Sequence, residues 1–148
     1  MVSLEVLRSC PYLAGVSNES LKAVAAITED RRFKTGEVLF NEGDPSRGLY
    51  IVRHGQIDII YRLHGGQERV VDTVVAGDLI GWSSLVEPHR STAKAVAREA
   101  GEAVWIAAAG IRALCEKDHT LGYHLLKQLA GVLSRRLQGA LVQIAAGS

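Results

Sequence analysis

The sequence lacks the features of a membrane, secreted or nucleic-acid-binding protein. None of its apolar runs reaches the roughly 18 residues that a membrane-spanning helix needs, and the N-terminus carries Glu5 and Arg8 instead of a signal peptide's apolar core. The net charge is only +1, so no basic excess would attract a phosphate backbone. Two cysteines, Cys10 and Cys115, form neither a disulfide framework nor a Cys-x-x-Cys metal site. These absences predict a cytoplasmic protein with two reduced thiols.

Motifs of common catalytic sites are absent as well. The five histidines, His54, His64, His89, His119 and His124, show neither His-x-His nor His-x-x-x-His spacing, and the last two fall on different faces of a helix. There is no Gly-x-Ser-x-Gly elbow and no phosphate-binding loop of the GxxxxGK[ST] type. We therefore predict that the chain is not an enzyme and has no catalytic or metal-ligating residues.

The chain does contain enough apolar sequence for a single folded domain. It has 148 residues, of which 47% are hydrophobic, so one domain over 1–148 is expected. Residues 1–32 predict a helical lead, in which Ser17 caps a second helix with Leu21, Val24 and Ile27 at helical spacing. Residues 33–107 predict strands, and residues 109–144 predict C-terminal helices.

The middle segment shows short strands separated by glycine turns. We predict strands over residues 37–40, 49–53, 57–63, 69–75, 92–98 and 103–106. Gly65-Gly66 is a hairpin signal between two of them. Many short strands of this kind predict a small sandwich, roll or barrel.

The C-terminal segment carries a stripe of apolar residues at steps of three or four. Its members are Leu126, Leu129, Leu133, Leu137, Leu141 and Ile144. The stripe either packs against the strands of its own domain or forms a helix–helix seam in a homodimer. Arg135 and Arg136 beside the stripe favour the dimer.

Several segments in a fixed order resemble the cyclic-nucleotide-binding domain. They are Gly36, residues 42–44, residues 49–52, Gly55 and residues 77–78, and residues 134–138 resemble the dimerisation helix of the catabolite activator (Crp/Fnr-like) family. The resemblance implies a mainly β fold, an eight-stranded antiparallel β-roll of the jelly-roll type with N-terminal helices and a long C-terminal helix. It also implies a regulatory domain that senses a cyclic nucleotide. Because the sequence ends at Ser148, where such regulators continue into a DNA-binding domain, no direct nucleic-acid binding is expected.

The resemblance places an anion site after residues 77–78. A short helix beginning at Gly81 would offer backbone amides, and Arg90 matches the family's phosphate-binding arginine. The hydroxyl groups of two following residues add donors. The predicted anion-binding residues are Gly81, Trp82, Ser83, Ser84, Arg90, Ser91 and Thr92.

Two departures from the family's pattern leave the ligand open. Trp82 stands where the family has a glutamate that binds the ribose hydroxyl, and an indole accepts no hydrogen bond. Ala140 and Leu141 stand where the catabolite activator has two hydroxyl residues that read the base. We predict a regulatory domain, without a cofactor, that signals by repositioning its C-terminal helix. Its ligand is a cyclic nucleotide, a different small anion or an apolar acid; the alternative is a ligand-free dimerisation or protein-interaction module.

Overall fold

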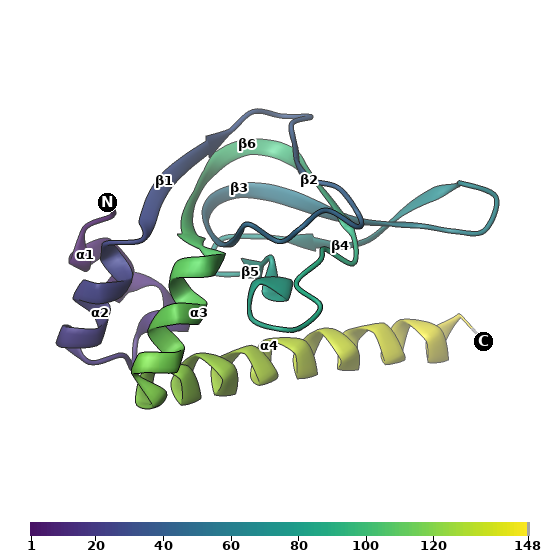
Figure 1. The fold of residues 1–148 in the computed structure, drawn as a ribbon. Helices are drawn as coiled ribbons and strands as arrows, with labels where there is room; N and C mark the ends of the chain where they lie inside the picture. Colours follow the sequence, from purple (N-terminus) through teal and green to yellow (C-terminus); the bar gives the residue numbers. More distant parts are fainter. Residues whose placement is uncertain (148) are drawn as a thin grey trace.

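The computed structural model describes residues 1–147 and shows two groups of helices packed against a β-roll (Figure 1). The N-terminal group contains α1 (Leu4–Ser9), the 3₁₀ helix η1 (Pro11–Leu13) and α2 (Asn18–Ala25). The side chain of Ser17 accepts a hydrogen bond of 3.2 Å from the amide of Ser20, so the predicted N-cap of α2 is confirmed. The C-terminal group contains α3 (Ala108–Lys117) and α4 (His119–Ala146).

The roll is one antiparallel sheet that curls on itself. Its strands are β1 (Thr28–Phe33), β2 (Val38–Phe40), β3 (Gly48–Arg62), β4 (Glu68–Val74), β5 (Leu79–Ile80) and β6 (Lys94–Ala107). The order is β1-β6-β3-β4, with β2 also paired to β6 and β5 paired to β3. A further 3₁₀ helix, η2 (Trp82–Ser84), follows β5. The predicted antiparallel β-roll with helices at both ends, of which the last is long, is confirmed, but residues 1–147 form six strands instead of the expected eight.

The first strand corrects the predicted helical lead over residues 1–32. Residues 28–32 lie in β1, which pairs with β6 from Thr28 opposite Ile106 to Phe33 opposite Gly101. Only the two end residues of β1 are buried, and the charged residues between them face outward. An edge strand of this kind shows no alternation of apolar residues, so the sequence pattern gave no strand signal there.

Two long, bent strands replace four of the predicted short ones. Predicted strands 49–53 and 57–63 lie in the continuous β3, while 103–106 and most of 92–98 lie in β6. The glycines that suggested strand ends mark bends instead. Gly55 has a φ of +90°, and a Cβ on Gly101 would lie 2.0 Å from the carbonyl oxygen of His54. The strands pass so closely here that only glycine fits.

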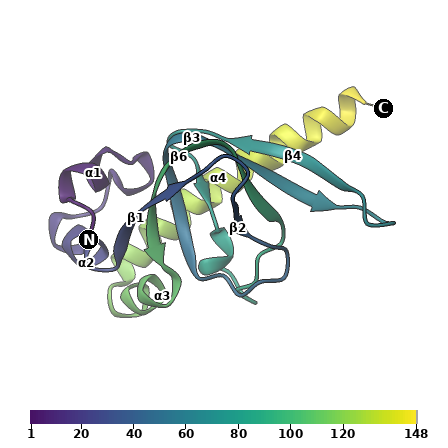
Figure 2. The same ribbon diagram turned by 90° about the horizontal axis from the view of Figure 1, so that it is seen from above.

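The β3–β4 hairpin extends beyond the roll. It closes between Leu63 and Gln67, with the predicted turn glycines Gly65 and Gly66 at its tip, both at positive φ. Figure 2 shows this hairpin and the C-terminal end of α4 extending on the same side of the molecule. The two elements therefore form opposite walls of one region.

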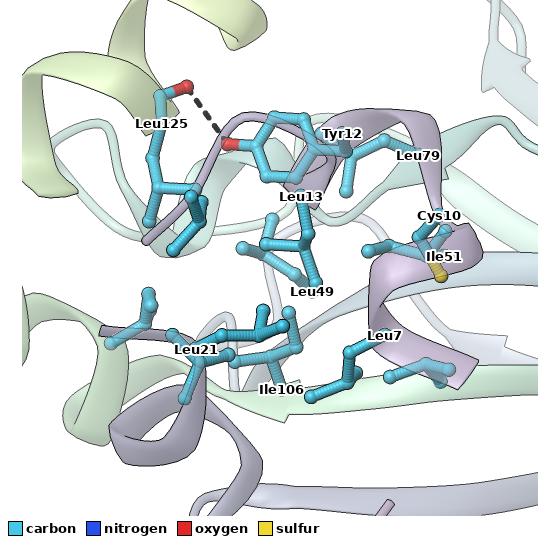
Figure 3. Close-up of a cluster of buried hydrophobic side chains, with 14 of the residues drawn as sticks. Leu7, Cys10, Tyr12, Leu13, Leu21, Leu49, Ile51, Leu79, Ile106 and Leu125 are labelled. Carbon is cyan, nitrogen blue, oxygen red and sulfur yellow. Dashed lines mark hydrogen bonds between the residues drawn. The ribbon is translucent and has the colours of Figure 1, made fainter. Parts of the chain in front are cut away.

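The first half of α4 belongs to the main hydrophobic core. Leu121, Leu125 and Leu129 pack with residues of the N-terminal helices and of β3 and β6. In Figure 3 the hydroxyl of Tyr12 donates a hydrogen bond to the carbonyl of Leu125, at 2.9 Å. A smaller core cluster fills the other end of the roll and includes three alanines of β6. The second half of α4 therefore extends from a fixed base.

Candidate ligand-binding site

A cleft of about 690 Å³ lies between the second half of α4 and the roll. Residues of β3, β4 and segment 77–82 line one wall, and residues 128–143 of α4 line the other. The apolar side chains are Pro11, Tyr12, Ile59, Tyr61, Val71, Leu79, Trp82, Val132, Leu133, Leu137 and Ala140. Small-molecule sites in proteins typically have about 300–1,000 Å³ and mostly apolar walls with a few polar groups. The cleft has the size and composition of such a site.

Arg136 crosses from α4 to the roll at this cleft. One Nη atom donates a hydrogen bond to the carbonyl of Leu79, and Nε lies 3.8 Å from the carboxylate of Asp72. Burial lowers the pKa of Arg136, and the carboxylates of Asp72 and Asp78 oppose that shift. The guanidinium is a partly desolvated positive charge in a mostly apolar cleft.

A second cavity, of only about 50 Å³, lies next to the cleft on the roll side. Five of the predicted anion-binding residues line it: Gly81, Trp82, Ser83, Ser91 and Thr92. Trp82 and Arg136 line both cavities. A water molecule has a share of about 30 Å³ in the liquid, so the smaller cavity is too small for a sugar phosphate.

Arg90 does not lie where the sequence predicted it. It is exposed, lines neither cavity, and donates a hydrogen bond of 2.9 Å to the carbonyl of Gly43. The backbone explains this position, because Ser91 exchanges hydrogen bonds with residues 43 and 44, and Arg90 bridges to Pro45. In such an extended pair, neighbouring side chains point to opposite sides, so Ser91 faces inward and Arg90 faces outward.

Ser84 and Gly81 serve the fold rather than an open anion site. Ser84 is fully buried; its hydroxyl lies 2.8 Å from that of Ser46, and its carbonyl accepts from Arg112 of α3. Its amide donates to the carbonyl of Gly81, so it is not available to a ligand. Gly81 has a φ of +82°, and a Cβ there would lie 2.5 Å from the carbonyl oxygen of Gly48. Glycine at this position permits a close approach to β3.

The residues of α4 that were predicted to form a dimer seam lie in three different places: the domain's own core, the cleft and the exposed surface. Leu129 is 2% exposed and packs in the domain's own core, and Leu133 packs against that core from the cleft. Leu137 and Leu141 are 60% and 53% exposed. At 100° per residue, the helix turns by about 120° between Leu129 and Leu141. Residues at steps of four therefore wind from the core face to the open face, and Leu129 and Leu133 do not belong to a dimer seam. The other members of the stripe, Leu126 and Ile144, are also exposed.

Both fold and residue pattern match a known family. The model of the cyclic nucleotide-binding domain matches residues 30–118, which is more than half of the chain. The chain belongs to the cyclic nucleotide-binding domain family. The crystal structure of a protein from Geobacter metallireducens, described as cyclic nucleotide-binding, is similar with a TM-score of 0.85 and 32% identity, covering 93% of this chain and 99% of that one. The N-terminal domain of a transcriptional regulator from Streptomyces coelicolor has a TM-score of 0.69 at 25% identity, covering 90% and 94%.

Two of the curated relatives that the chain matches are bacterial regulators. The cyclic AMP receptor protein of Thermus thermophilus is 29% identical over 135 residues, which are 90% of this chain and 60% of that protein. A CRP-like cAMP-activated global transcriptional regulator of Mycobacterium tuberculosis is 26% identical over 134 residues, covering 90% and 58%. The chain thus spans about 60% of the length of these curated relatives.

Trp82 is the main departure of this family member. Its half-buried ring packs against the main core and separates the small cavity from the cleft. An aromatic ring at this place adds apolar surface but no acceptor for a sugar hydroxyl. On α4, Ala140 lines the cleft without a polar side-chain atom. Neither Trp82 nor Ala140 therefore offers a side-chain hydrogen-bond acceptor to a ligand in the cleft.

Sequence reasoning missed Arg136 as a site residue. The arginine pair 135–136 was interpreted as charges flanking a dimer seam. A signal was present, however, because Arg136 follows the buried Leu129 by seven residues, which is within about 20° of the same helix face. The inward-facing walls of β3 and β4, Ile59 and Val71, were also missed, because no local motif marks them.

Other chemistry is limited in the described part of the chain. Within residues 1–147, no group of three or more His, Cys, Asp and Glu side chains could hold a metal ion. Cys10 and Cys115 are free thiols, and burial raises the pKa of each, which disfavours the reactive thiolate. None of the helices between residues 1 and 147 is both long and apolar enough to span a membrane.

Proposed function

We propose that this chain is a regulatory domain that binds a small ligand in the cleft and signals by repositioning α4. The observation that carries the proposal is that the roll and α4 each form one wall of the same ligand-sized cleft. A ligand that contacts both walls favours the position of α4 in which both contacts are made. Because Arg136 already joins α4 to β5 through Leu79, binding near this contact changes how the helix is held.

The ligand is an anion in this proposal, for which cyclic AMP and cyclic GMP are the first compounds to test. Support for a nucleotide comes from the names of the relatives, one of which is a cyclic AMP receptor protein. The anion contact is assigned to Arg136 instead of Arg90, because Arg136 lines both cavities and Arg90 lines neither. The protein acts in the cytoplasm and catalyses no reaction in this proposal, in line with its two free thiols.

A homodimer through α4 is the second part of the proposal. Leu137, Leu141 and Val142 are more than half exposed on the last turns of α4, beyond the domain's own core. Exposed apolar side chains concentrated on one helix end are typical of a helix–helix interface. Sedimentation equilibrium at micromolar concentration should give the mass of a dimer, and a monomer mass would reject this part.

The test of ligand binding uses Trp82 as a reporter. The chain has two tryptophans, so the Trp105→Phe variant leaves Trp82, which lines both cavities, as the only one. Cyclic AMP, cyclic GMP and organic acids should be titrated against its fluorescence, and hydrogen exchange of residues 126–146 should be measured at saturation. A bound ligand should change both signals. A ligand that changes the fluorescence but leaves the exchange of α4 unaltered would refute signalling through the helix.

The alternative is a ligand-free interaction module. Its support is that the small cavity, which Trp82 and Arg136 line, has a volume of only about 50 Å³. The same experiment separates the two functions. No response to any compound, together with a dimer mass, would favour the interaction module over the sensor.

A further inference from the structure

We propose that the ligand of the cleft is an apolar organic acid, a ring or branched hydrocarbon body with one carboxylate or sulfonate group that Arg136 binds. This inference rests on the proposed function, because it assumes that the cleft binds a ligand. It specifies the chemical class, and that class is not a nucleotide.

The walls of the cleft fit a hydrocarbon body. Val71 from β4 and Leu137 from α4 line opposite sides, and Trp82 adds an aromatic ring. With a volume of about 690 Å³, the cleft lies within the range of sites for compact organic ligands. Apolar walls of this kind bind by removing apolar surface of the ligand from water.

Arg136 fits the acid group. Its two contacts use Nε and one Nη atom, and among residues 1–147 no partner is found for the other Nη. The guanidinium is planar and presents paired donors that match the two oxygens of a carboxylate. Burial also lowers its pKa, the direction expected for a cation that has lost part of its hydration.

The neighbouring carboxylates do not block this contact. Asp72 lies 3.8 Å from Nε with its side chain 46% exposed, so it can turn to water when an acid arrives. Asp78 accepts a hydrogen bond from the amide of Val75 and is engaged in the turn before β5. An acid that binds in the cleft therefore competes for Arg136 with its ion pair to Asp72, in which Nε and the carboxylate lie 3.8 Å apart.

The same surroundings disfavour a sugar phosphate. The cavity beside Ser83 and Ser91 is about 50 Å³, and the indole of Trp82 accepts no hydrogen bond. Arg90 points away from it. Recognition by the guanidinium of Arg136, with Arg135 also lining the cleft, and by apolar walls selects for negative charge and hydrocarbon shape.

The experiment compares two fluorescent probes with the same ring system. Anilinonaphthalene sulfonate carries a sulfonate, and N-phenylnaphthylamine does not. A charge-assisted hydrogen bond corresponds to about ten- to a hundredfold in affinity, so wild type should bind the sulfonate tighter by that factor. In Arg136→Gln the preference should disappear, while Arg136→Lys should keep part of it. Circular dichroism checks that both variants fold.

A second pair of variants tests the place of binding without changing the core. Ala140 is an exposed residue of α4 that lines the cleft, and Gln138 is an exposed neighbour that does not. Ala140→Phe should fill the cleft and weaken the sulfonate at least tenfold, whereas Gln138→Phe should leave its affinity unchanged.

Three results would overturn the inference. They are equal affinity of wild type for the two probes, an unchanged preference in Arg136→Gln, and equal effects of the phenylalanine variants. Loss of probe binding as the protein dimerises would also overturn it, because a second copy would then occupy the cleft. If cyclic AMP binds and alters α4 while the sulfonate probe does not bind, the inference fails and the proposed function stands. If no compound alters α4, the proposed function itself fails.

Discussion

Replacing Gly81 with alanine should destabilise the domain more than the same change at Gly43. The two glycines have nearly equal backbone angles, with φ of +82° and +85°. A left-handed conformation costs a residue with a Cβ about 1–2 kcal/mol. Alanine also restricts the unfolded chain, but equally at both positions. The backbone terms therefore cancel when the two variants are compared.

The surroundings of Gly43 and Gly81 differ, and this difference sets how much more stability Gly81→Ala loses than Gly43→Ala. A Cβ at Gly43 meets nothing within 4 Å, whereas one at Gly81 lies 2.5 Å from the carbonyl oxygen of Gly48. An unstrained carbon–oxygen contact is about 3.3 Å, so η2 or β3 must move by about 0.8 Å. Overpacking of this kind costs about 1–3 kcal/mol. We expect a loss of about 1–2 kcal/mol for Gly43→Ala and about 2–5 kcal/mol for Gly81→Ala.

Urea unfolding followed by circular dichroism measures both losses. For a domain of this size, 1 kcal/mol corresponds to roughly 3 °C in the melting temperature, so thermal melts give an independent check. Gly81→Ala should also alter the Trp82 fluorescence, because the displaced residue precedes it directly. Equal losses of stability in the two variants would refute the argument that the close approach of β3 requires glycine at position 81.

Three further predictions concern the helices around the cleft. Leu129→Ala should destabilise the monomer by about 2–5 kcal/mol in urea unfolding. Leu141→Ala, at an exposed residue that does not line the cleft, should change it by less than about 0.5 kcal/mol and weaken the dimer in sedimentation. Tyr12→Phe should lower the free energy of unfolding by about 1 kcal/mol, the value of one buried hydrogen bond. Burial raises the pKa of Tyr12 above that of an exposed tyrosine, so Tyr12 does not contribute to the phenol absorbance step near pH 10. The amplitude of that step should therefore be the same in wild type and in this variant. The hydroxyl of Ser20 is the main cause that lowers the pKa of Asp118, so the stabilisation by this carboxylate is complete above the unfolded value of about 3.9 and is lost as the pH falls through the lower folded value. The stability difference between wild type and Asp118→Asn should therefore be constant above pH 5 and shrink below about pH 4; a difference that stays constant down to pH 2 would contradict it.

The sequence predicted those parts of the fold in which the local pattern of apolar residues reflects which side chains are buried. Alternation of apolar residues and glycine turns predicted a small sandwich, roll or barrel, of which the family resemblance selected the roll. Ser17 identified the start of α2. Prediction from the sequence failed where contacts between distant segments determine the secondary structure. The charged strand β1 forms because β6 offers an open edge, and its only inward residues are Thr28 and Phe33. The bend at Gly55 was interpreted as a strand end, because the sequence does not show that β3 passes close to Gly101 of β6 there.

The site was predictable only in part, for a related reason. Five of the seven predicted anion-binding residues line the small cavity, and their role in binding stays a prediction. Side-chain direction was not predictable, since it depends on pairing between residues 43–46 and 89–91, which sends Arg90 outward. Arg136 was missed because its partner Leu79 lies 57 residues away in the sequence. The spacing from Leu129 indicates which face of α4 carries Arg136, but no local pattern identifies Leu79 as its partner.

The position of Arg136 links the two proposals thermodynamically. The residue joins the roll at Leu79 and Asp72, and the exposed Leu137 follows it directly in α4. In the two proposals, an acid that takes the guanidinium from Asp72 changes how α4 is held, and dimerisation through Leu141 and Val142 holds the last turns of the same helix. Coupling between two binding events is reciprocal. If the ligand changes the dissociation constant of the dimer by some factor, then the affinity of the dimer for the ligand differs from that of the monomer by the same factor. Leu141→Ala, which weakens the dimer without lining the cleft, should therefore shift ligand affinity only at protein concentrations where wild type is dimeric.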